Sequence, residues 1–439
     1  MADALSFLHG LPLVVGVGYL SYLILWRCFL SPLAGVPGPK LAALTYWYEC
    51  YYDIIQPAQY AFKIKRLHGE YGPVVRIGPN DVSISDPDFI DTIYAPGPGH
   101  KRDKDAIHSR SLGLSSSVGS SITHELHRRR RDALNPFFSP QRIHRLDPDL
   151  ASKAVQVDNI FDNAKASGQV LNLSDIYFAF SNDVVHKYCF GSDPNLLSSL
   201  QLANARRNNV VSVLGSVKIM LHFSWIRKLL QMLPGGGTGA HGMMIFRRRI
   251  RAQIDEVLAD RFSPEYSSSI FTHLNGSTEL PAAEKSAQRL EDEAVLMIMA
   301  GTYSPTLSLV VAHYHLLTRP DIMAKLRTEL GVYGSVIPTE AAELERLPYL
   351  SAITQEAHRL TFGLTGRNAR VCPDEPITYK NKERGQAYTF PPGTSLSAST
   401  LVIHTDESLF PDPWAFDPER WVSPPLPLRR YRHVLSRGC

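Results

Sequence analysis

The chain has 439 residues, of which 44% are hydrophobic and 20% are charged. This mixture excludes a disordered, collagen-like or disulfide-stapled polypeptide and indicates a large globular protein. The 46 basic residues outnumber the 42 acidic residues by only four, which argues against a nucleic-acid-binding protein with a concentrated basic face.

The cysteines form no CxxC pair and no tight cluster, which disfavours a zinc site and a disulfide framework. They are Cys28, Cys50, Cys189, Cys372 and Cys439. We expect reduced thiols in a protein that faces the cytosol.

The first 40 residues predict a membrane anchor followed by a hinge. In residues 5–26 only His9 could carry a charge near neutral pH, and a helix needs about 20 apolar residues to cross a bilayer. Basic residues follow this segment while its amino side is almost uncharged, which predicts a cytoplasmic location for the rest of the chain. Pro37 and Pro39 stop the helix from continuing. We predict an anchor at residues 1–30, a hinge at 31–40 and one domain at 41–439.

The remainder is predicted to be mainly α with a small β portion. Residues 71–86 predict a β-hairpin, because β-branched runs flank a Gly-Pro-Asn-Asp turn. Residues 389–405 predict a turn followed by an alternating strand. Apolar residues at helical spacing predict helices at residues 151–164, 242–259, 288–317, 320–330 and 350–360.

Two separated motifs point to a specific family. Glu356 and Arg359 lie on one face of a predicted helix, although most such pairs are solvated surface ion pairs. The segment FPDPWAFDPERW follows at residues 410–421 and carries Arg420. Together, the Glu-x-x-Arg pair and this Pro-Glu-Arg element resemble the cytochrome P-450 superfamily, the heme-thiolate monooxygenases.

The resemblance extends over nearly the whole chain, including the arginine-rich segment 123–139. It is closest to fungal secondary-metabolism members that oxidise terpenoid-like skeletons. It implies a cytochrome P-450-like fold that binds a b-type heme. It also implies that Glu356, Arg359 and Arg420 form a buried charge network that supports the region under the heme, where losing one partner would be costly.

The resemblance suggests residues that hold the heme propionates. His127 and Arg131 are one helical turn apart. Many relatives have W-x-x-x-R here, so His127 would replace the tryptophan as donor, and the planar guanidinium of Arg131 would hold a carboxylate. Arg370 is a third candidate. From the residues alone, the arginines at 128–131 could equally form a solvated basic face.

The oxygen-activating pattern of the family falls at residues 300–305, where Tyr303 occupies the acid position and Ser304 the threonine position. Ser304 could supply a hydroxyl for proton delivery, but tyrosine, with a reference pKa near 10, does not replace a carboxylate. Pro305 is expected to kink the helix. The alternative is a kinked core helix without a catalytic role.

The end of the chain departs from the family pattern F-x-x-G-x-R-x-C, whose cysteine is the thiolate ligand of iron. Leu435 and Gly438 align with the Phe and Gly, so Cys439 takes the variable position. The resemblance therefore implies a fold that lacks the C-terminal heme-ligand loop and the following helix. Cys439 is the fallback ligand of the heme iron.

We predict a heme-dependent monooxygenase that oxidises an apolar small molecule in fungal secondary-metabolite biosynthesis. Its expected partners are a membrane and an NADPH-cytochrome reductase, with no nucleic acid. It would be a single-pass protein of the endoplasmic reticulum membrane with a cytoplasmic catalytic domain. Two alternatives are a non-oxygenating heme-thiolate isomerase, which needs no proton delivery to dioxygen, and a truncated, catalytically inactive remnant.

Overall fold

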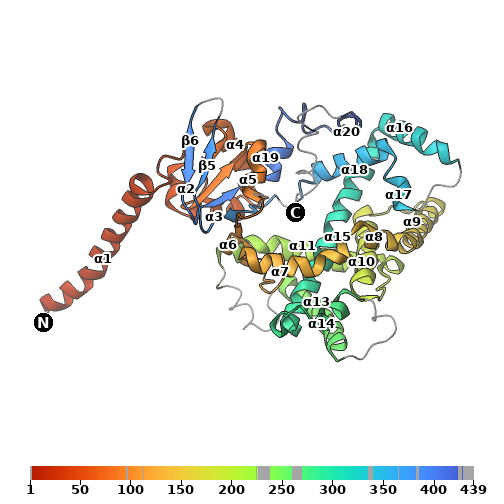
Figure 1. Cartoon of the computed structure of the whole chain (residues 1–439), viewed down its shortest axis with the longest axis horizontal. Helices are drawn as coiled ribbons and strands as arrows, with labels where there is room; N and C mark the ends of the chain where they lie inside the picture. The colour runs from red at the N-terminus through yellow and green to blue at the C-terminus, as the bar shows by residue number, and fades with distance from the viewer. Residues whose placement is uncertain are drawn as a thin grey trace. The chain divides into compact units, whose positions relative to one another are not determined.

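The computed structural model describes residues 2–94, 97–111, 113–223, 225, 238–259, 269–334, 340–363, 365–381, 385–423 and 428. The chain divides into two compact units, whose elements are labelled in Figure 1. The first unit comprises Met1–His108 and Leu364–Thr405, and the second comprises Ser109–Gly363 and Asp406–Cys439. Each unit therefore combines an earlier and a later part of the sequence.

The first unit begins with α1 (Ala2–Leu25), which continues directly into the π-helical turn η1 (Trp26–Leu30). The hinge residues separate this segment from a group of short helices. These are α2 (Lys40–Leu44), α3 (Trp47–Cys50), the turn η2 (Tyr51–Ile55), α4 (Tyr60–Tyr71), the turn η3 (Pro87–Phe89), α5 (Ile90–Tyr94), α6 (Ala106–Arg110) and α19 (Thr400–His404).

The β structure of the described chain lies in the first unit. The strands are β1 (Val74–Arg76), β2 (Asp81–Ile84), β3 (Asp103–Lys104), β4 (Arg370–Val371), β5 (Ile377–Lys380), β6 (Ala387–Phe390) and β7 (Ser395–Ser397). One sheet has the order β1-β2-β7-β4-β3, and β5 pairs with β6 separately. The pairing of β1 with β2 is antiparallel and sets Val74 opposite Ile84, which confirms the predicted hairpin. The β2–β7 pair is parallel, whereas the other pairs are antiparallel.

The prediction for residues 389–405 is only half right. β6 ends at Phe390, a turn follows, and β7 spans Ser395–Ser397, but residues 400–404 form the helix α19 rather than a strand. Leu401, Val402, Ile403 and His404 are all buried, so this stretch has no alternation between buried and exposed sides. A continuously apolar run of this length fits a short buried helix as well as a strand.

Apolar side chains from both sequence parts fill the core of the first unit. One cluster joins Val82 and Ile84 of β2 to Leu396 of β7 and Phe390 of β6. Since burying a side chain of this size contributes about 1.5–3 kcal/mol, these contacts hold the hairpin and the later strands in one sheet.

The second unit is helical. Its helices are α7 (His124–Leu134), α8 (Pro140–Ile143), α9 (Asp147–Ser167), α10 (Leu173–Phe190), α11 (Leu200–His222), α13 (Thr238–Leu258), α14 (Ile270–Gly276), α15 (Ala287–Thr318), α16 (Pro320–Leu330), α17 (Ala341–Leu344), α18 (Pro348–Thr361) and α20 (Glu419–Val422). Short turns lie between them, namely η4 (Asn135–Phe138), η5 (His144–Leu146), η6 (Leu196–Ser198), η8 (Ala282–Lys285) and η9 (Gly331–Tyr333). The five helices predicted from periodicity correspond to α9, α13, α15, α16 and α18.

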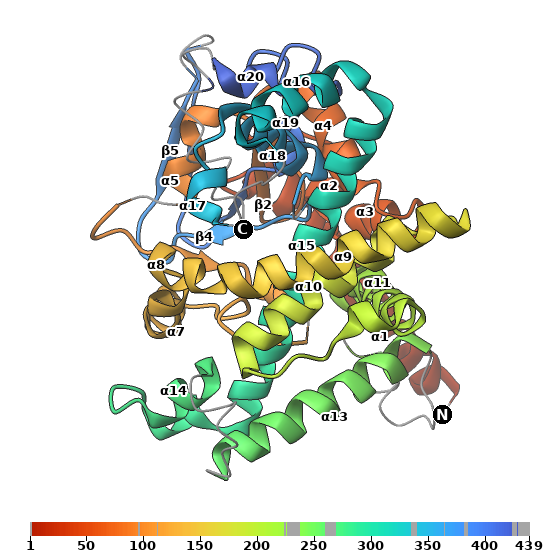
Figure 2. The same cartoon turned by 90° about the vertical axis from the view of Figure 1, so that its right-hand side faces the viewer.

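The long helix α15 is the centre of the second unit. It packs against α10, α13 and α18, and Figure 2 shows α10 crossing α15. Leu290, Ala294 and Ile298 of α15 are almost completely buried in a cluster with residues of α10, α13 and α14. Ser286 caps the amino end of α15, because its hydroxyl oxygen accepts the amide N–H of Arg289.

Two apolar helices bear on the predicted membrane anchor. In the described part of the chain, the helix that is long and apolar enough to cross a bilayer is α15, and 39% of its apolar window is buried. Its packing in the second unit makes it a core helix. A shorter apolar helix runs over Val14–Leu30, and its Leu20 and Phe29 side chains are exposed. The membrane-spanning role of the N-terminal segment stays a prediction.

Candidate active site

Glu356 and Arg359 form a buried, bidentate ion pair on α18. The Nε of Arg359 donates to Glu356 Oε2 at 2.8 Å, and its Nη2 donates to Glu356 Oε1 at 2.7 Å. Glu356 is 0% exposed and Arg359 is 2% exposed. The pair is therefore far from the solvated surface contact that an i, i+3 pair usually makes.

The segment before α20 completes the coordination of this pair. Arg359 Nη1 donates to the Pro413 carbonyl at 2.5 Å, and Nη2 donates to the Ala415 carbonyl at 3.0 Å. The backbone N–H of Asp417 donates to Glu356 Oε1 at 2.9 Å. Each charge thus has several partners, which is the condition under which a buried ion pair is tolerated.

The structure brings Arg420 to the same carboxylate. Its Nε lies 3.5 Å from Glu356 Oε1, and its Nη2 donates to the Asp412 carbonyl at 2.8 Å. A second hydrogen bond goes from Arg420 Nη1 to the Pro411 carbonyl. Asp412 has a φ of +49°, so the loop turns back through a left-handed residue at the point where Arg420 holds it.

Sequence reasoning missed one member of this cluster. The indole Nε1–H of Trp421 donates to Glu356 Oε2 at 2.8 Å, and Trp421 is 6% exposed. The signal that could have identified it is the aromatic residue directly after the Pro-Glu-Arg element, because a buried tryptophan usually directs its N–H to an acceptor.

The predicted oxygen-activation residues lie on α15, in the second unit. Ser304 is exposed and donates its hydroxyl to the Ala300 carbonyl at 2.9 Å, one turn earlier. Tyr303 is half-buried, and Pro305 lies inside the helix, which continues through it. Because proline has no N–H, it cannot bond the Gly301 carbonyl. The Ser304 hydroxyl is thus engaged within the helix.

Thr302, between these residues, was not predicted to contribute. It is 2% exposed, and its Oγ1 accepts from Asn182 Nδ2 of α10 at 3.2 Å. The hydroxyl of Thr306 donates to the Thr302 carbonyl at 2.7 Å. The Asn182–Thr302 hydrogen bond joins this face of α15 to α10.

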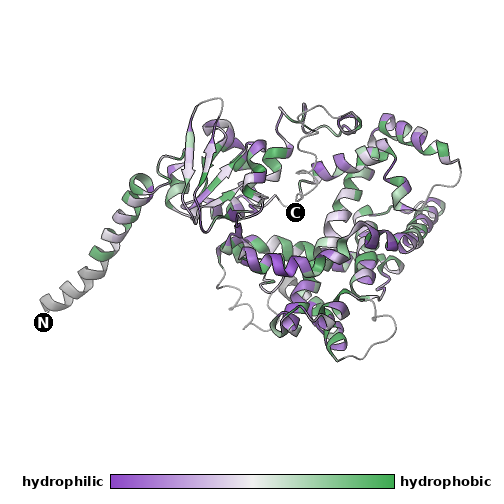
Figure 3. Ribbon diagram, viewed as in Figure 1, coloured by the Kyte–Doolittle hydropathy of each residue, from purple (hydrophilic) through white to green (hydrophobic). Residues whose placement is uncertain are grey.

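The predicted propionate residues on α7 differ in exposure. His127 is half-buried and Arg131 is exposed, whereas the neighbouring Arg130 is 8% exposed. Arg130 donates through Nε and Nη2 to Glu284, at 2.8 and 3.1 Å. In Figure 3 most of α7 is coloured as hydrophilic. Arg130 is thus engaged in a buried ion pair, whereas Arg131 is exposed at the surface.

Glu284 also accepts a hydrogen bond from Arg289 Nε at 3.0 Å. Burial alone would raise the pKa of Glu284, but the hydrogen bonds from Arg130 and Arg289 outweigh it and lower this pKa below its usual value. Arg130 therefore fixes α7 to the turn before α15.

Arg370 belongs to the first unit, on β4. Its Nη1 donates to Asn368 Oδ1 at 2.7 Å, and its guanidinium carbon lies 5.2 Å from the centre of the Tyr94 ring. Burial lowers the pKa of Arg370, partly offset by Tyr94. Arg370 thus belongs to a different unit from the site residues on α15, α18 and α7, which lie in the second unit.

Three of the cysteines in the described ranges, Cys50, Cys189 and Cys372, are buried and do not suit the proximal iron ligand. Cys28, Cys50, Cys189 and Cys372 are free. Burial raises the pKa of the Cys189 thiol to about 12, and burial followed by Asp53 raises that of Cys50. Cys372 is 3% exposed and accepts from Arg102 Nη1 at 3.2 Å. A ligand must be an accessible thiolate. Cys439 lies outside the described residues.

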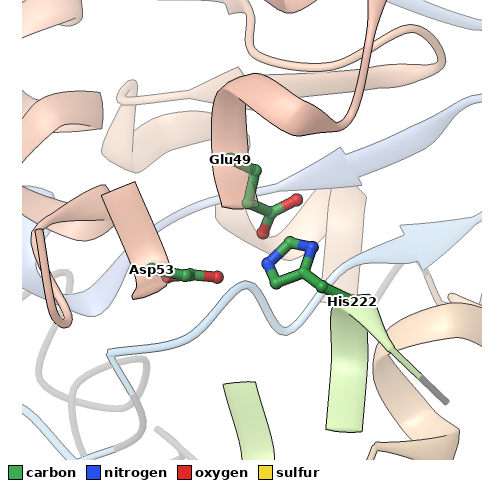
Figure 4. Close-up of side chains that lie close together, drawn as sticks. All are labelled: Glu49, Asp53 and His222. Carbon is green, nitrogen blue, oxygen red and sulfur yellow. The ribbon is translucent and has the colours of Figure 1, made fainter. Parts of the chain in front are cut away.

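The first unit contains a second buried charge cluster, which the sequence did not suggest. Arg367 donates to Glu49, and its Nη1 lies 3.1 Å from Asp81 Oδ1. Burial would lower the pKa of Arg367, but Glu49 and Asp81 outweigh it and raise this pKa. Figure 4 shows Glu49 on α3 and Asp53 on η2; His222, also drawn, belongs to the second unit. This cluster joins α3, β2 and the segment after α18.

The comparisons with known proteins agree with these motifs. The family model described as "Cytochrome P450" matches residues 43–431, which include parts of both units. The chain is 38% identical to the cytochrome P450 monooxygenase tpcC of Cochliobolus heterostrophus, over 97% of this chain and 82% of the relative. It is 36% identical to the monooxygenase astB of Talaromyces wortmannii, over 100% and 84% of the two chains. It is 33% identical to the conidiogenone synthase PchP450 of Penicillium rubens, over 97% and 87%.

Proposed function

Because the chain belongs to the cytochrome P450 family, whose members use heme iron, and is an oxidoreductase of the monooxygenase type, we propose that it oxidises an apolar, terpenoid-like small molecule. The reaction would be a step of fungal secondary-metabolite biosynthesis. The terpenoid-like substrate follows from the resemblance of the sequence to fungal secondary-metabolism members. The conidiogenone synthase of Penicillium rubens and the monooxygenase TRI4 of Fusarium sporotrichioides, which is 31% identical, are among the relatives.

The observation that carries the proposal is the interior position of the two family motifs. Glu356 and Arg359 lie on α18, and Arg420 lies more than 60 residues later. Both arginines nevertheless lie against the buried carboxylate of Glu356. A polypeptide that carried these motifs without the family fold would not bury three charged side chains together, because each unpaired buried charge costs several kcal/mol. These residues are supports and do not touch substrate.

We assign the remaining candidates their places around the heme, which supplies oxygen activation when bound. His127, Arg131 and Arg370 would hold its propionates, and Cys439 would be the fallback ligand of its iron. Arg131 suits this role because it is exposed, while Arg130 beside it is occupied by Glu284. Ser304 and Tyr303 would occupy the oxygen-activation positions, where the Ser304 hydroxyl, which donates to the Ala300 carbonyl, could move a proton.

The N-terminal segment would anchor the protein in the endoplasmic reticulum membrane as a single span. The apolar stretch at residues 5–26, the exposed Leu20 and Phe29, and Arg27 after the span support this role and a cytoplasmic catalytic domain. An NADPH-cytochrome reductase at the same surface would supply electrons. Deleting residues 1–30 should move the protein from the membrane fraction to the soluble fraction; retention in the membrane fraction would contradict the anchor.

The direct test of the reaction combines the purified full chain, a fungal NADPH-cytochrome reductase and a panel of terpenoid hydrocarbons under ¹⁸O₂. We expect a product that carries one labelled oxygen atom, with NADPH consumption that depends on substrate and reductase. NADPH consumption without a labelled product from any apolar substrate would contradict the proposal. The reaction without reductase is the control.

A second candidate is non-oxygenating chemistry, such as isomerisation or dehydration of an oxidised substrate. Its support is the degenerate pattern on α15, where Tyr303 replaces the acid and Ser304 bonds within the helix. This function predicts conversion of an oxygenated substrate without NADPH and with no label from ¹⁸O₂. An inactive remnant would bind no heme and convert neither kind of substrate, so the same assay separates the three hypotheses.

A further inference from the structure

A small cavity lies within the second unit, between α10, α11, α13 and α15. Its volume is about 60 Å³. It is lined by apolar residues such as Phe178 and Met299 and by polar side chains that include His186, Arg206 and Arg249. Helices α11 and α13 come close together here, as a Cβ on Gly242 of α13 would lie only 2.6 Å from Asn209 Cγ of α11.

This cavity is separate from the candidate active site. Thr302 of α15 lines it, whereas the oxygen-activation position is Ser304. Two residues along an α-helix are rotated by about 200°, so these side chains leave α15 in nearly opposite directions. The cavity therefore lies on the side of α15 that faces α10.

The two arginines of the cavity are positioned for a negative ligand. The Nε of Arg206 is buried and has no hydrogen-bond partner among the described residues. Burial, followed by repulsion from Arg249, lowers the pKa of Arg206 to about 10. A buried guanidinium donor that bonds nothing is costly, and a second positive charge beside it adds to the cost.

The charge of Asp183 raises the pKa of Arg206 and so offsets part of this cost, but the Asp183 carboxylate makes its hydrogen bonds elsewhere. Asp183 of α10 is fully buried, and its Oδ2 accepts from Lys153 Nζ at 3.0 Å and from the Leu197 amide at 3.2 Å. Its Oδ1 accepts from the Leu196 amide at 2.7 Å. Lys153 and two backbone amides thus satisfy Asp183, and among the described residues neither cavity arginine forms an ion pair with an acid.

His186 adds a hydrogen-bond acceptor rather than a third charge. Its Nδ1 lies 3.3 Å from the Ser192 carbonyl, so this nitrogen carries the proton and Nε2 is left as an acceptor. Burial lowers the pKa of His186, and the charges of Arg206 and Arg249 lower it further. A neutral imidazole beside two guanidiniums suits an anion, and it can accept a hydrogen bond from an O–H group where the anion carries one, as monohydrogen phosphate does.

We propose that the cavity binds a small oxyanion, a phosphate or carboxylate group, held by the guanidiniums of Arg206 and Arg249. Two guanidiniums can make paired, charge-assisted hydrogen bonds to the oxygens of such a group. A water needs roughly 10–15 Å³ of such volume, so the cavity has room for a group of several heavy atoms. The bound anion would link α10, α11, α13 and the Thr302 face of α15.

The test is calorimetric titration of the purified full chain with inorganic phosphate, against chloride at the same ionic strength. We expect saturable binding with one site, and a loss of affinity of about ten- to a hundredfold in Arg206→Gln and Arg249→Gln. The control is Arg248→Gln, because Arg248 is exposed on the same helix and does not line the cavity. Far-UV circular dichroism verifies folding of each variant. If Arg206→Gln does not fold, Arg249→Gln still tests the proposal, because Arg249 is exposed and its substitution should leave folding intact.

Glycerol phosphate and acetate identify the source of the anion. Tighter binding of glycerol phosphate than of inorganic phosphate would support a phosphoester, and tighter binding of acetate would support a carboxylate. Absence of binding of all three anions would overturn the proposal and leave a cavity that holds water. Binding that is unchanged in both Arg206→Gln and Arg249→Gln would also overturn it, because the anion would then lie elsewhere.

Discussion

Trp421 donates its indole Nε1–H to Glu356 Oε2 over 2.8 Å, although the two residues are 65 positions apart. The same carboxylate accepts from Arg359 and from the Asp417 amide and lies 3.5 Å from Arg420 Nε. Glu356 is thus the point at which α18, α20 and the loop before α20 are joined. Removing its charge would leave two buried guanidiniums without their carboxylate.

We predict that Glu356→Gln lowers the free energy of unfolding by about 3–5 kcal/mol, the usual cost of breaking a buried ion pair from one side. Urea denaturation followed by tryptophan fluorescence measures this. The matched control is Glu343→Gln, because Glu343 is exposed on α17 and should change stability by no more than about 0.5 kcal/mol. Equal effects of the two substitutions would contradict the assigned role of Glu356.

Arg131 should matter for heme retention and not for folding. We predict that Arg131→Ala lowers the heme-to-protein ratio after purification, because a propionate loses its cationic partner, while the urea midpoint stays unchanged. Arg129→Ala is the control, since Arg129 is also exposed on α7. If both variants keep or lose heme to the same extent, α7 offers only a solvated basic face. The pyridine hemochrome assay gives the ratio.

The hinge contains a glycine that no other residue should replace. Gly38 has a φ of +152°, and a Cβ on it would lie 2.4 Å from the backbone oxygen of Arg76. We predict that Gly38→Ala destabilises the protein by about 1–3 kcal/mol. Gly69→Ala is the control, because Gly69 lies in α4 with nothing within 4 Å, and alanine there should stabilise by about 0.5–1 kcal/mol. Thermal denaturation shows whether each substitution lowers or raises the stability of the protein.

His68 should make stability depend on pH. Burial lowers the pKa of His68 to about 4, from the usual 6.5, against an opposing hydrogen bond to the Gly72 carbonyl. The unfolded chain therefore binds a proton that the folded chain does not bind between pH 6.5 and 4. The contribution to stability is complete above pH 6.5 and falls as the pH is lowered toward 4, by about 3 kcal/mol.

The substitution His68→Gln should remove this part of the pH dependence. Urea midpoints of the wild type and the variant at pH 7 and pH 4.5 give the difference. A variant whose midpoint falls with pH as steeply as that of the wild type would contradict the assignment of the slope to His68.

The sequence predicted the elements that have one apolar face or a clear boundary. α16 spans Pro320–Leu330 as expected, because proline favours the first turn of a helix. α10 (Leu173–Phe190) and α11 (Leu200–His222) were not predicted. In α10, buried residues such as Ile176, Phe178 and Asp183 occur on most of its sides, so it has no single apolar stripe.

Site residues were predictable where two sequence motifs support each other. They were not predictable where a role depends on which side of a helix is exposed. The Glu-x-x-Arg pair and Arg420 require each other, and the structure places them together. Of the arginines at 128–131, however, Arg130 is the one that pairs with Glu284, which lies 154 residues away. Consecutive helical residues point in directions about 100° apart, and sequence alone does not tell which direction faces a distant acid. The Thr302–Asn182 contact was missed for the same reason.

As a member of the cytochrome P450 family, this chain is expected to hold a heme, for which Cys439 is the fallback ligand of the iron. The measurement that tests it most directly is the absorption spectrum of the reduced carbon monoxide complex of the purified 439-residue chain. We predict a Soret band at the position that marks thiolate ligation, lost in Cys439→Ser and kept in Cys28→Ser. A chain without this band, or a Cys439→Ser variant that keeps it, would contradict the account.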